Sequence, residues 1–229
     1  MDSAEPRIQN STYPEAEEFL VDKAYSAIRQ AIVRNELKPG SSLSEGSLSE
    51  QLGISRTPIR AALKRLEEES LVRIVPRRGA FVTDVSAEDI VQMYQLREAL
   101  ECYAIQFVPL YGDPAELEQL AAQVEQVHGW IREGDIERVN EFDIHMHRYI
   151  ACASRNPMLC KLIDKLLSQV IRLRNMTPTV PGRLERQADE QLGIVKALKA
   201  GDVATAREEL RTHLQTVLDT AVQIRLRMR

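Results

Sequence analysis

Apolar residues recur at intervals of three and four along the first third of the chain, which is the spacing of amphipathic helices. The first such stretch covers residues 19–35, and the Pro-Gly step at positions 39 and 40 ends it. A short second helix is expected over residues 44–52. Ser55 is placed to cap a third helix that reaches about Ser70. The pattern therefore predicts three helices in close succession.

The third predicted helix has two chemically different faces. Its apolar residues follow helical spacing and are expected to enter the core, whereas the opposite face repeats a basic residue every four positions. A short helix, a tight turn and a second helix with such a face describe a helix-turn-helix, whose recognition helix enters the major groove by its N-terminal end. The DNA contacts expected from this helix are Ser55, Arg56, Thr57, Arg60 and Lys64.

A β-hairpin is expected directly after these helices. Two short β-branched segments, residues 71–75 and 80–83, flank the sequence Pro-Arg-Arg-Gly. Arg77, Arg78 and Gly79 at its tip are typical of a DNA-contacting wing. The alternative for residues 18–83 is a plain three-helix bundle. The joint presence of cap, turn, basic face and basic hairpin favours a winged helix-turn-helix.

The remainder of the chain is predicted to be an all-α bundle. Helical periodicity, Asp or Ser caps and Pro or Gly breaks delimit six helices, and no stretch follows the alternation of a strand. The expected helices begin near residues 86, 113, 135, 157, 183 and 202. The predicted organisation is a flexible tail (1–17), a winged helix-turn-helix domain (18–83) and a helical ligand-binding and dimerisation domain (84–229).

Four polar residues of this second domain are expected to converge. Asp143 and His147 are four residues apart and share one helix face. Gln191 precedes the turn at Gly201 by roughly 15 Å of helix and His213 follows it by roughly 18 Å, so the two lie almost level across a helical hairpin. One Asp and two His suit a divalent transition ion. The alternative is a surface or hydrogen-bonded core pair.

Composition and charge narrow the class of protein. With 44% hydrophobic and 28% charged residues, the chain is globular rather than disordered, and no apolar run is long enough to cross a membrane. The polar N-terminus lacks the apolar segment of a signal peptide, so a cytoplasmic location is expected. Cys102, Cys152 and Cys160 have no CxxC spacing and are expected to be buried thiols rather than disulfides.

The net charge of −4 hides a division along the chain. Residues 18–83 carry 11 Lys and Arg against 8 Asp and Glu, a net charge of +3, while the flanking segments are acidic. This concentration suggests one module for a polyanion, although a solvated helix face would give the same count. An architectural, nonspecific DNA binder is disfavoured because its affinity would depend on far more basic residues.

The residues of the first domain resemble the winged-helix domain of the GntR family of bacterial transcription regulators. The resemblance covers Leu20 to about Ser86 and includes Leu-Lys-Pro-Gly, Leu-Gly-Ile-Ser-Arg-Thr-Pro-Ile-Arg and Arg-Gly-Ala-Phe-Val in family order. It implies that the DNA contacts are Ser55, Arg56, Thr57 and Arg60 of the recognition helix and Arg78 and Gly79 of the wing. Two residues depart from the family pattern: Ala61 replaces Glu, and Ser70 replaces Gly.

The second domain resembles the FCD ligand-binding domain of the FadR subfamily. The matching residues include Arg97-Glu98-Ala99-Leu100-Glu101 and the spacing of Asp143, His147, Gln191 and His213. The resemblance implies six or seven helices and a Zn²⁺-type or Ni²⁺-type ion held by one Asp and three His. Gln191 takes one of the His positions, and an amide is a poorer ligand, so metal binding is expected to be weak or absent.

The resemblance also places Arg97 near a bound effector, whose carboxylate a guanidinium could bind in bidentate fashion. The alternative for Arg97 is an ion pair with Glu101, one turn further along the same helix. The expected ligand-binding residues are Arg97, Asp143, His147, Gln191 and His213, of which Asp143, His147 and His213 are the expected metal ligands.

The sequence therefore predicts a homodimeric transcription regulator, more often a repressor in this family, rather than an enzyme. Its winged helix is expected to bind a palindromic double-stranded DNA operator, because two recognition helices related by a two-fold axis contact two half-sites. A small organic acid is the expected effector, and no membrane partner is expected. The rival function is a metal-dependent hydrolase that uses Asp143, His147 and His213 to hold a metal-bound water.

Overall fold

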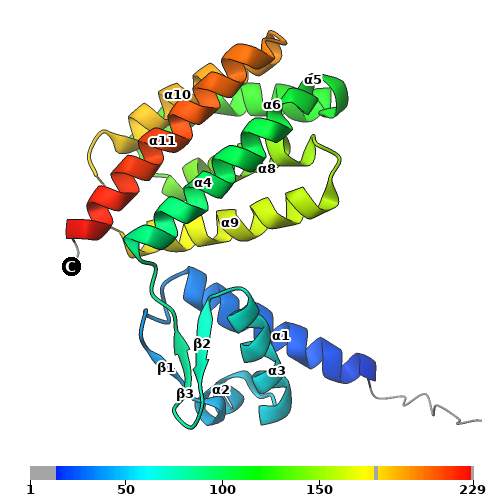
Figure 1. Ribbon diagram of the computed structural model, residues 1–229, viewed down its shortest axis with the longest axis vertical. Helices are drawn as coiled ribbons and strands as arrows, with labels where there is room; N and C mark the ends of the chain where they lie inside the picture. Colours follow the sequence, from blue (N-terminus) through cyan, green and yellow to red (C-terminus); the bar gives the residue numbers. More distant parts are fainter. Residues whose placement is uncertain (1–13, 178–179, 228–229) are drawn as a thin grey trace, which may run out of the picture. The chain divides into compact units, whose positions relative to one another are not determined.

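The computed structural model describes residues 14–177 and 180–227 (Figure 1). The chain divides into two compact units, residues 1–84 and 85–229. Most of the predicted N-terminal tail, residues 1–13, lies outside the described residues. Residues 14–17, predicted as part of that tail, are instead helical.

The first unit is a small helical domain that carries a three-stranded antiparallel sheet. The predicted three helices and hairpin are confirmed, but the two-residue strand β1 is too short to have a detectable alternation. It pairs with β3, which lies in the middle of the sheet, and Leu43 faces Ala80. The elements are α1 (Pro14–Val33), β1 (Ser42–Leu43), α2 (Glu45–Leu52), α3 (Arg56–Glu68), β2 (Val72–Val75) and β3 (Gly79–Val82).

Local signals fix the position of the recognition helix. The side chain of Ser44 accepts a hydrogen bond from the Ser47 backbone N–H at the start of α2, and Gly53 ends α2 in the left-handed conformation. Ser55 occupies the N-cap of α3 as expected, but its side chain makes no capping hydrogen bond. The apolar face of α3 is fully buried through Ile59, Ala62, Leu63 and Leu66.

The two departures from the GntR pattern occupy different environments. Ala61 is exposed on α3. Ser70 has a φ of +59°, which explains the glycine usually found at this position, since glycine adopts positive φ without a side-chain clash. The Ser70 carbonyl accepts a hydrogen bond from the Thr83 hydroxyl at 2.7 Å, which helps to hold this turn against the end of the hairpin.

The second unit is an all-α bundle, as predicted. Among its described residues, seven helices have about two turns or more. A 3-10 turn (Ile105–Phe107) and the one-turn helix α5 (Val108–Tyr111) extend α4. The single helix expected from residue 113 to 134 is two helices that break at Glu125–Gln126. The seven are α4 (Ala87–Ala104), α6 (Pro114–Val124), α7 (Val127–Glu133), α8 (Ile136–Cys152), α9 (Pro157–Met176), α10 (Arg183–Lys199) and α11 (Val203–Arg227).

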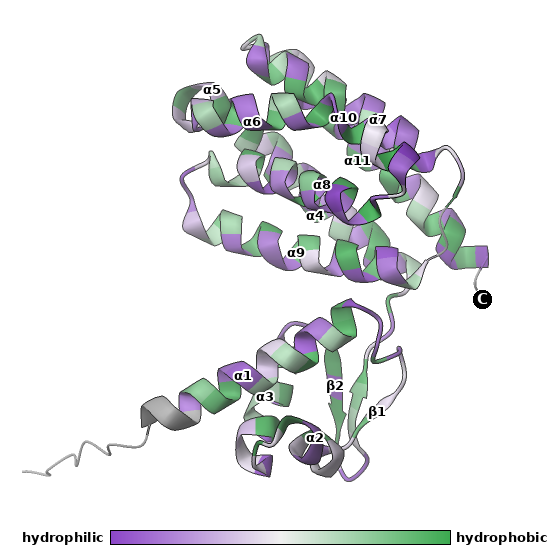
Figure 2. Ribbon diagram, turned by 180° about the vertical axis from the view of Figure 1, so that it is seen from behind, coloured by the Kyte–Doolittle hydropathy of each residue, from purple (hydrophilic) through white to green (hydrophobic). Residues whose placement is uncertain are grey.

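The bundle is arranged around two helical hairpins. Helices α10 and α11 pack along each other, as do α8 and α9, and α4 contacts both α11 and α8. Apolar and polar faces alternate around these helices (Figure 2), as amphipathic helices in a bundle require. The core is mostly aliphatic, yet eight polar or charged residues are also buried in the second unit: Arg97, Glu101, Asp143, His147, Arg172, Gln187, Gln191 and His213.

The structure corrects one expectation about the cysteines. Cys152 and Cys160 form a disulfide, where free thiols were predicted. The short turn between α8 and α9 brings their Cα atoms to 5.0 Å, a separation that the spacing along the sequence could not reveal without the position of the turn. Cys102 is free and half-buried, and burial raises the pKa of its thiol to about 11.

None of the helices within the described residues is both long enough and apolar enough to cross a lipid bilayer.

Candidate DNA-contacting surface and ligand site

The recognition helix α3 presents its predicted DNA-contacting residues to solvent. Ser55, Arg56, Thr57, Arg60 and Lys64 are all exposed, while the opposite face is buried. Arg60 is not free in this state: its guanidinium binds the carboxylate of Glu45, the first residue of α2. A row of exposed cations on a helix anchored by its apolar face is the arrangement that helix-turn-helix proteins insert into the major groove.

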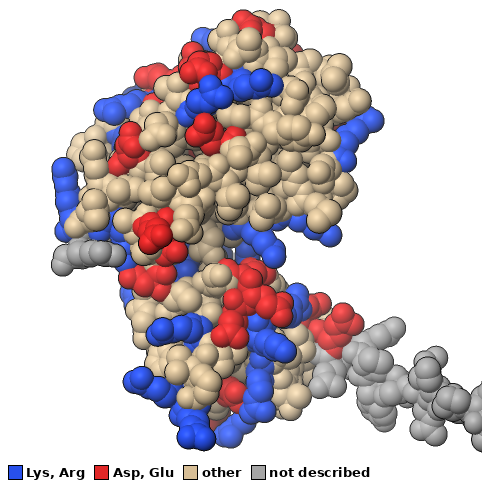
Figure 3. Space-filling model, viewed as in Figure 1, with Lys and Arg blue, Asp and Glu red and all other residues tan. Residues whose placement is uncertain are grey.

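The hairpin between β2 and β3 carries a second group of cations. Arg77, Arg78 and Gly79 are exposed, and the Arg78 backbone N–H closes the turn on the Val75 carbonyl at 3.0 Å. Gly79 has a φ of +99°, which favours glycine, and Arg77 adopts the left-handed region at +64°. Lys and Arg side chains gather on the end of the first unit that carries α2 and the hairpin (Figure 3).

In the second unit, three residues form a compact buried group. Asp143 and His147 come from α8 and His213 from α11, and each offers a ligand atom within 4.8 Å of the others. The two imidazole rings are stacked with centroids 5.3 Å apart. The structure therefore brings together the residues that helical spacing and hairpin geometry predicted to converge.

Both imidazoles are oriented by a carboxylate on their outer nitrogen. His147 Nδ1 lies 2.5 Å from Glu101, and His213 Nδ1 lies 2.9 Å from Glu190. Burial lowers the pKa of His147, but the adjacent carboxylate of Glu101 outweighs it and raises the pKa overall. Burial lowers the pKa of His213, which favours its neutral form. Such carboxylate–imidazole pairs fix the ring orientation of metal-binding histidines.

Asp143 is held in its ionised form by several donors. Arg174 donates to Oδ2 at 2.7 Å, and the amides of Gln187 and Gln191 each donate to Oδ1 at 2.6 Å. Burial alone would raise the pKa of Asp143, but Arg174 and His147 outweigh it and hold the pKa well below its usual range. Gln191 therefore acts toward Asp143 as a hydrogen-bond donor.

These residues supply the ligand types and the fixed ring orientations that a metal site requires. Asp143, His147 and His213 supply one carboxylate and two imidazoles, and both rings have their outer nitrogens held by carboxylates, which leaves Nε2 available. The third imidazole, which would be the fourth ligand of the family pattern, is missing because Gln191 stands in its place. The set fits a three-ligand transition-metal site whose carboxylate is already partly neutralised by Arg174.

Arg97 forms an ion pair with Glu101, which is the alternative that the four-residue spacing of the two side chains allowed. Its Nε donates to Glu101 at 2.8 Å, and both side chains are almost completely buried. Its guanidinium also lies 5.2 Å from the ring centroid of Tyr94. Arg97, Glu101 and His147 thus form a chain that leads to Asp143.

Several polar atoms around this chain are buried without a hydrogen-bond partner within the described part of the protein. Unpaired buried polar groups are rare in proteins, and they mark sites where a ligand, ion or water completes the bonding. Arg183 is also without a counter-charge that would offset its burial: burial and then the nearby Arg174 lower the pKa of its guanidinium. The atoms are Arg97 Nη2, His147 Nε2, Arg183 Nε, Gln187 Oε1 and Gln191 Oε1.

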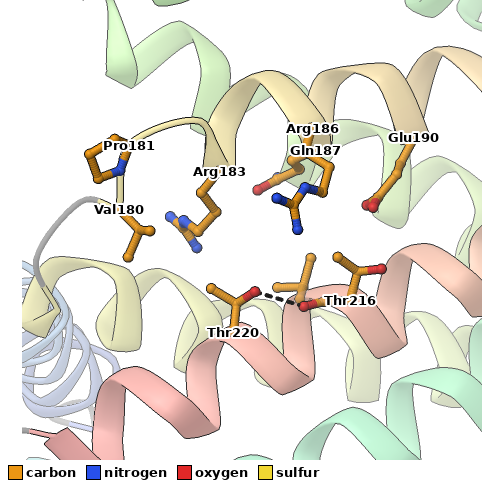
Figure 4. A pocket seen from close by; sticks show the side chains of 9 residues that line it. Val180, Pro181, Arg183, Arg186, Gln187, Glu190, Thr216 and Thr220 are labelled. Atoms are coloured by element: carbon orange, nitrogen blue, oxygen red, sulfur yellow. Dashed lines mark hydrogen bonds between the residues drawn. The ribbon is translucent and has the colours of Figure 1, made fainter.

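A pocket of about 60 Å³ opens between α10 and α11 next to these residues (Figure 4). Arg183, Arg186, Gln187 and Glu190 extend into it from the α10 side, facing threonines of α11. The buried cluster consists of Arg97, Glu101, Asp143, His147, Gln187, Gln191 and His213. Gln187 of this cluster also lines the pocket and binds Asp143, and Glu190 lines the pocket and binds His213. The pocket therefore adjoins the cluster and has the size of a small anion.

Comparison with known proteins identifies the family. The family model "Bacterial regulatory proteins, gntR family" matches residues 20–82, and the FCD domain model matches residues 92–216. The chain belongs to the GntR family. It combines a GntR helix-turn-helix with an FCD domain, and it is a DNA-binding transcriptional regulator rather than an enzyme. These findings lend no support to the hydrolase alternative.

Individual relatives agree with this assignment. An uncharacterised HTH-type transcriptional regulator from an unstable DNA locus of Streptomyces ambofaciens is 31% identical over 211 residues, covering 88% of this chain and 84% of the relative. The HTH-type transcriptional repressor RspR of Escherichia coli K12 is 26% identical, with 88% of both chains covered. The solved structure of E. coli McbR/YncC has a TM-score of 0.75 at 25% identity, covering 89% of this chain and 97% of that one.

Four residues in or beside the buried cluster could not be recognised from the sequence as parts of a site. The sequence indicates Glu101 only as the partner of Arg97, and it gives no separate signal for Arg174, Gln187 or Glu190. Glu190 and Gln187 lie one residue before and one turn before Gln191, so helical periodicity from Gln191 was the one usable indication for Gln187. The position of Arg174 depends on how α9 packs against α8, which periodicity does not determine.

Proposed function

We propose that this GntR-family protein is a homodimeric, cytoplasmic repressor that binds a palindromic operator and releases it when a small carboxylate binds the FCD domain. The observation that carries the effector assignment is the group of cationic side chains with unpaired buried donors between α4, α8, α9 and α10. Repression is supported by the similarity to RspR, which is named as a repressor.

The charge of the site favours an anionic effector. Four arginines, Arg97, Arg174, Arg183 and Arg186, come to a region that holds three carboxylates, those of Glu101, Asp143 and Glu190. A carboxylate entering from the α10–α11 pocket would bind the unpaired Nε of Arg183, which lines that pocket. The unpaired amide oxygens of Gln187 and Gln191 would accept hydrogen bonds from hydroxyl or amino groups of the same ligand.

A thermal-shift screen of small mono- and dicarboxylates tests this assignment. At about 100 times its dissociation constant, a true effector contributes about 2.7 kcal/mol of stability. This corresponds to a rise of several degrees in the Tm reported by Trp130, the one tryptophan of the chain. The Arg183→Gln variant is expected to lose most of this shift, whereas Arg132→Gln, an exposed arginine of α7, keeps it. A screen in which no acid changes the Tm of the wild type would count against an anionic effector.

The metal site is proposed to be weak in the wild-type protein. Asp143, His147 and His213 would hold the ion, which when bound would supply a positive charge for an effector carboxylate. The three side chains stay oriented without it, because Glu101, Glu190 and Arg174 fix them.

Replacing Gln191 by His is expected to raise affinity for Zn²⁺ or Ni²⁺ by about 10–100-fold, since it restores the fourth ligand. Metal titration of the purified, chelator-treated protein measures the change, and His213→Ala in the same background should abolish the gain. Stoichiometric, chelator-resistant metal in the wild type would show instead that Gln191 is itself an adequate ligand. Negligible metal in both proteins would mean that the four positions do not form a site.

The dimer is proposed to form through α4. This helix exposes apolar side chains two turns apart on one face, Leu96 (47% exposed) and Tyr103 (53% exposed), with Ala99 between them. Leu110 of the following α5 is 68% exposed. A monomer rarely exposes such a stripe, and a second copy is the partner that a palindromic operator requires.

Tyr103→Glu is expected to raise the dimer dissociation constant by at least about tenfold, because the two-fold axis would place the two new charges in one apolar interface. Analytical ultracentrifugation measures the dissociation constant. Met158→Glu, which alters an 82% exposed apolar residue on α9, serves as the control and should leave the dimer intact. An unchanged dimer in Tyr103→Glu would assign the interface to another face.

A further inference from the structure

The guanidinium of Arg60 is held by a carboxylate on the neighbouring helix. Its Nε donates to Glu45 Oε1 at 3.0 Å and its Nη2 to Oε2 at 2.8 Å, a bidentate contact between α3 and the first residue of α2. The Arg60 side chain is 70% exposed and that of Glu45 34% exposed. Exposed ion pairs add little to stability, so the contact is better explained by what it does to the position of Arg60.

The bidentate contact uses one edge of the guanidinium and leaves another available. Arg has five N–H donors in a rigid plane, and Glu45 accepts the Nε donor and one Nη2 donor. The remaining Nη1 and Nη2 hydrogens point along the outer edge of the plane. Two parallel donors on that edge match the O6 and N7 acceptors that guanine presents in the major groove.

The start of α2 also lies close to the second arginine of the recognition helix. A Cβ added at Gly46 would come 3.6 Å from Arg56 Nη2, so this guanidinium passes beside the α2 backbone. The Glu45 carboxylate feels the charges of both Arg60 and Arg56, with the hydrogen bond to Arg60 as the largest influence that lowers its pKa. Glu45 hydrogen-bonds Arg60, and Arg56 remains beside it.

We propose that Glu45 is a positioning residue that holds Arg60 so that its outer guanidinium edge contacts a guanine of the operator. The inference rests on the proposed role of α3 in contacting DNA. It makes Glu45, an acidic residue on a DNA-facing surface, a determinant of sequence specificity. Without Glu45, the long Arg60 side chain samples other rotamers and binds phosphates as readily as a base edge.

The proposal and simple electrostatics predict opposite effects for Glu45→Gln. Removing a negative charge near DNA should strengthen binding to every duplex if charge alone matters. The positioning role predicts that affinity for the preferred duplex falls by roughly tenfold and that the preference for guanine at one position of each half-site is lost. Affinity for unrelated duplexes should stay the same or rise.

The duplex is obtained by selecting wild-type protein against a random double-stranded library, and binding is followed by fluorescence anisotropy. Glu50→Gln removes the same charge from an exposed position of the same helix and should leave the guanine preference intact. In an Arg60→Ala background, Glu45→Gln should cause no further loss, because Glu45 acts through Arg60.

Three outcomes separate this proposal from the underlying function. If Glu45→Gln binds the selected duplex as tightly as the wild type and with the same guanine preference, Glu45 does not position Arg60. If Glu45→Gln loses affinity equally in the presence and absence of Arg60, its effect is on α2 and the proposal is wrong. If Arg60→Ala itself leaves binding unchanged, the DNA-contacting role of α3 fails, independently of Glu45.

Discussion

Glu101→Ala is expected to lower the free energy of unfolding of the FCD domain by about 3–5 kcal/mol, the cost of removing one partner from a buried ion pair. Glu101 is completely buried and binds Arg97 at 2.8 Å and His147 at 2.5 Å. Burial alone would raise the pKa of Glu101, but Arg97 and His147 outweigh it and lower the pKa. The substitution leaves the buried Arg97 cation without its main counter-charge.

Chemical unfolding followed by Trp130 fluorescence measures this loss, because that tryptophan lies in α7 and therefore reports on the second unit. Glu98→Ala is the matched control: its carboxylate pairs with Arg211 at 3.3 Å, but both side chains are substantially exposed, so its removal should cost less than about 1 kcal/mol. If the two variants unfolded at the same denaturant concentration, the Arg97–Glu101–His147 chain would not be part of the folded core.

Arg56→Ala and Arg60→Ala are each expected to weaken operator binding by about 1–3 kcal/mol for each half-site contacted. Because a symmetric dimer places the substitution in both half-sites, the loss per dimer approaches twice that value when the contacts are independent. Both side chains are exposed on α3 and take no part in its buried apolar face, so neither substitution disturbs the core.

Binding isotherms for the selected duplex, with sedimentation of the free protein as a check on dimerisation, measure these effects. Arg132→Ala removes an exposed cation from the FCD domain and should change operator affinity very little. Operator affinity at the wild-type level in both α3 variants would show that α3 is not the helix that contacts the operator.

The first unit could be predicted closely because its signals are local. The period of apolar residues, the cap at Ser44 and the glycine after α2 are properties of short segments, and the structure reproduces the three helices and the hairpin. Strand β1 was not predicted because a two-residue strand is too short to show an alternation of apolar and polar residues. The break between α6 and α7 escaped it because the apolar spacing continues through Glu125–Gln126.

The buried cluster was predictable only where geometry follows from one helix or one hairpin. Asp143 and His147 share a helix face, and Gln191 of α10 and His213 of α11 each come close to Asp143 from a packed helical hairpin. Arg174, by contrast, reaches Asp143 from α9, and the Cys152–Cys160 disulfide depends on the turn between α8 and α9. Those contacts come from how helices pack, which the periodicity of each helix leaves undetermined.

The buried cluster places an unusual number of polar and charged side chains in a helical core. Arg97, Glu101, Asp143, His147, Gln187, Gln191 and His213 are all nearly inaccessible to solvent. Aliphatic side chains of similar size would fill the same volume without unpaired atoms, and replacing buried ion pairs in that way is often neutral or stabilising. These polar groups are what the proposed ligand site requires, and an aliphatic core could not supply them.

The central claim is that a small acid in the FCD domain controls operator binding by a dimer, and one titration tests it directly. The selected duplex is titrated with wild-type protein in the presence and absence of the acid that raises the Tm of the Trp130-reported unit. The account predicts two protomers bound per duplex and an operator dissociation constant that rises by about 5–150-fold with the acid, the usual range of allosteric coupling. An affinity that stays the same with every acid that stabilises the protein would contradict it.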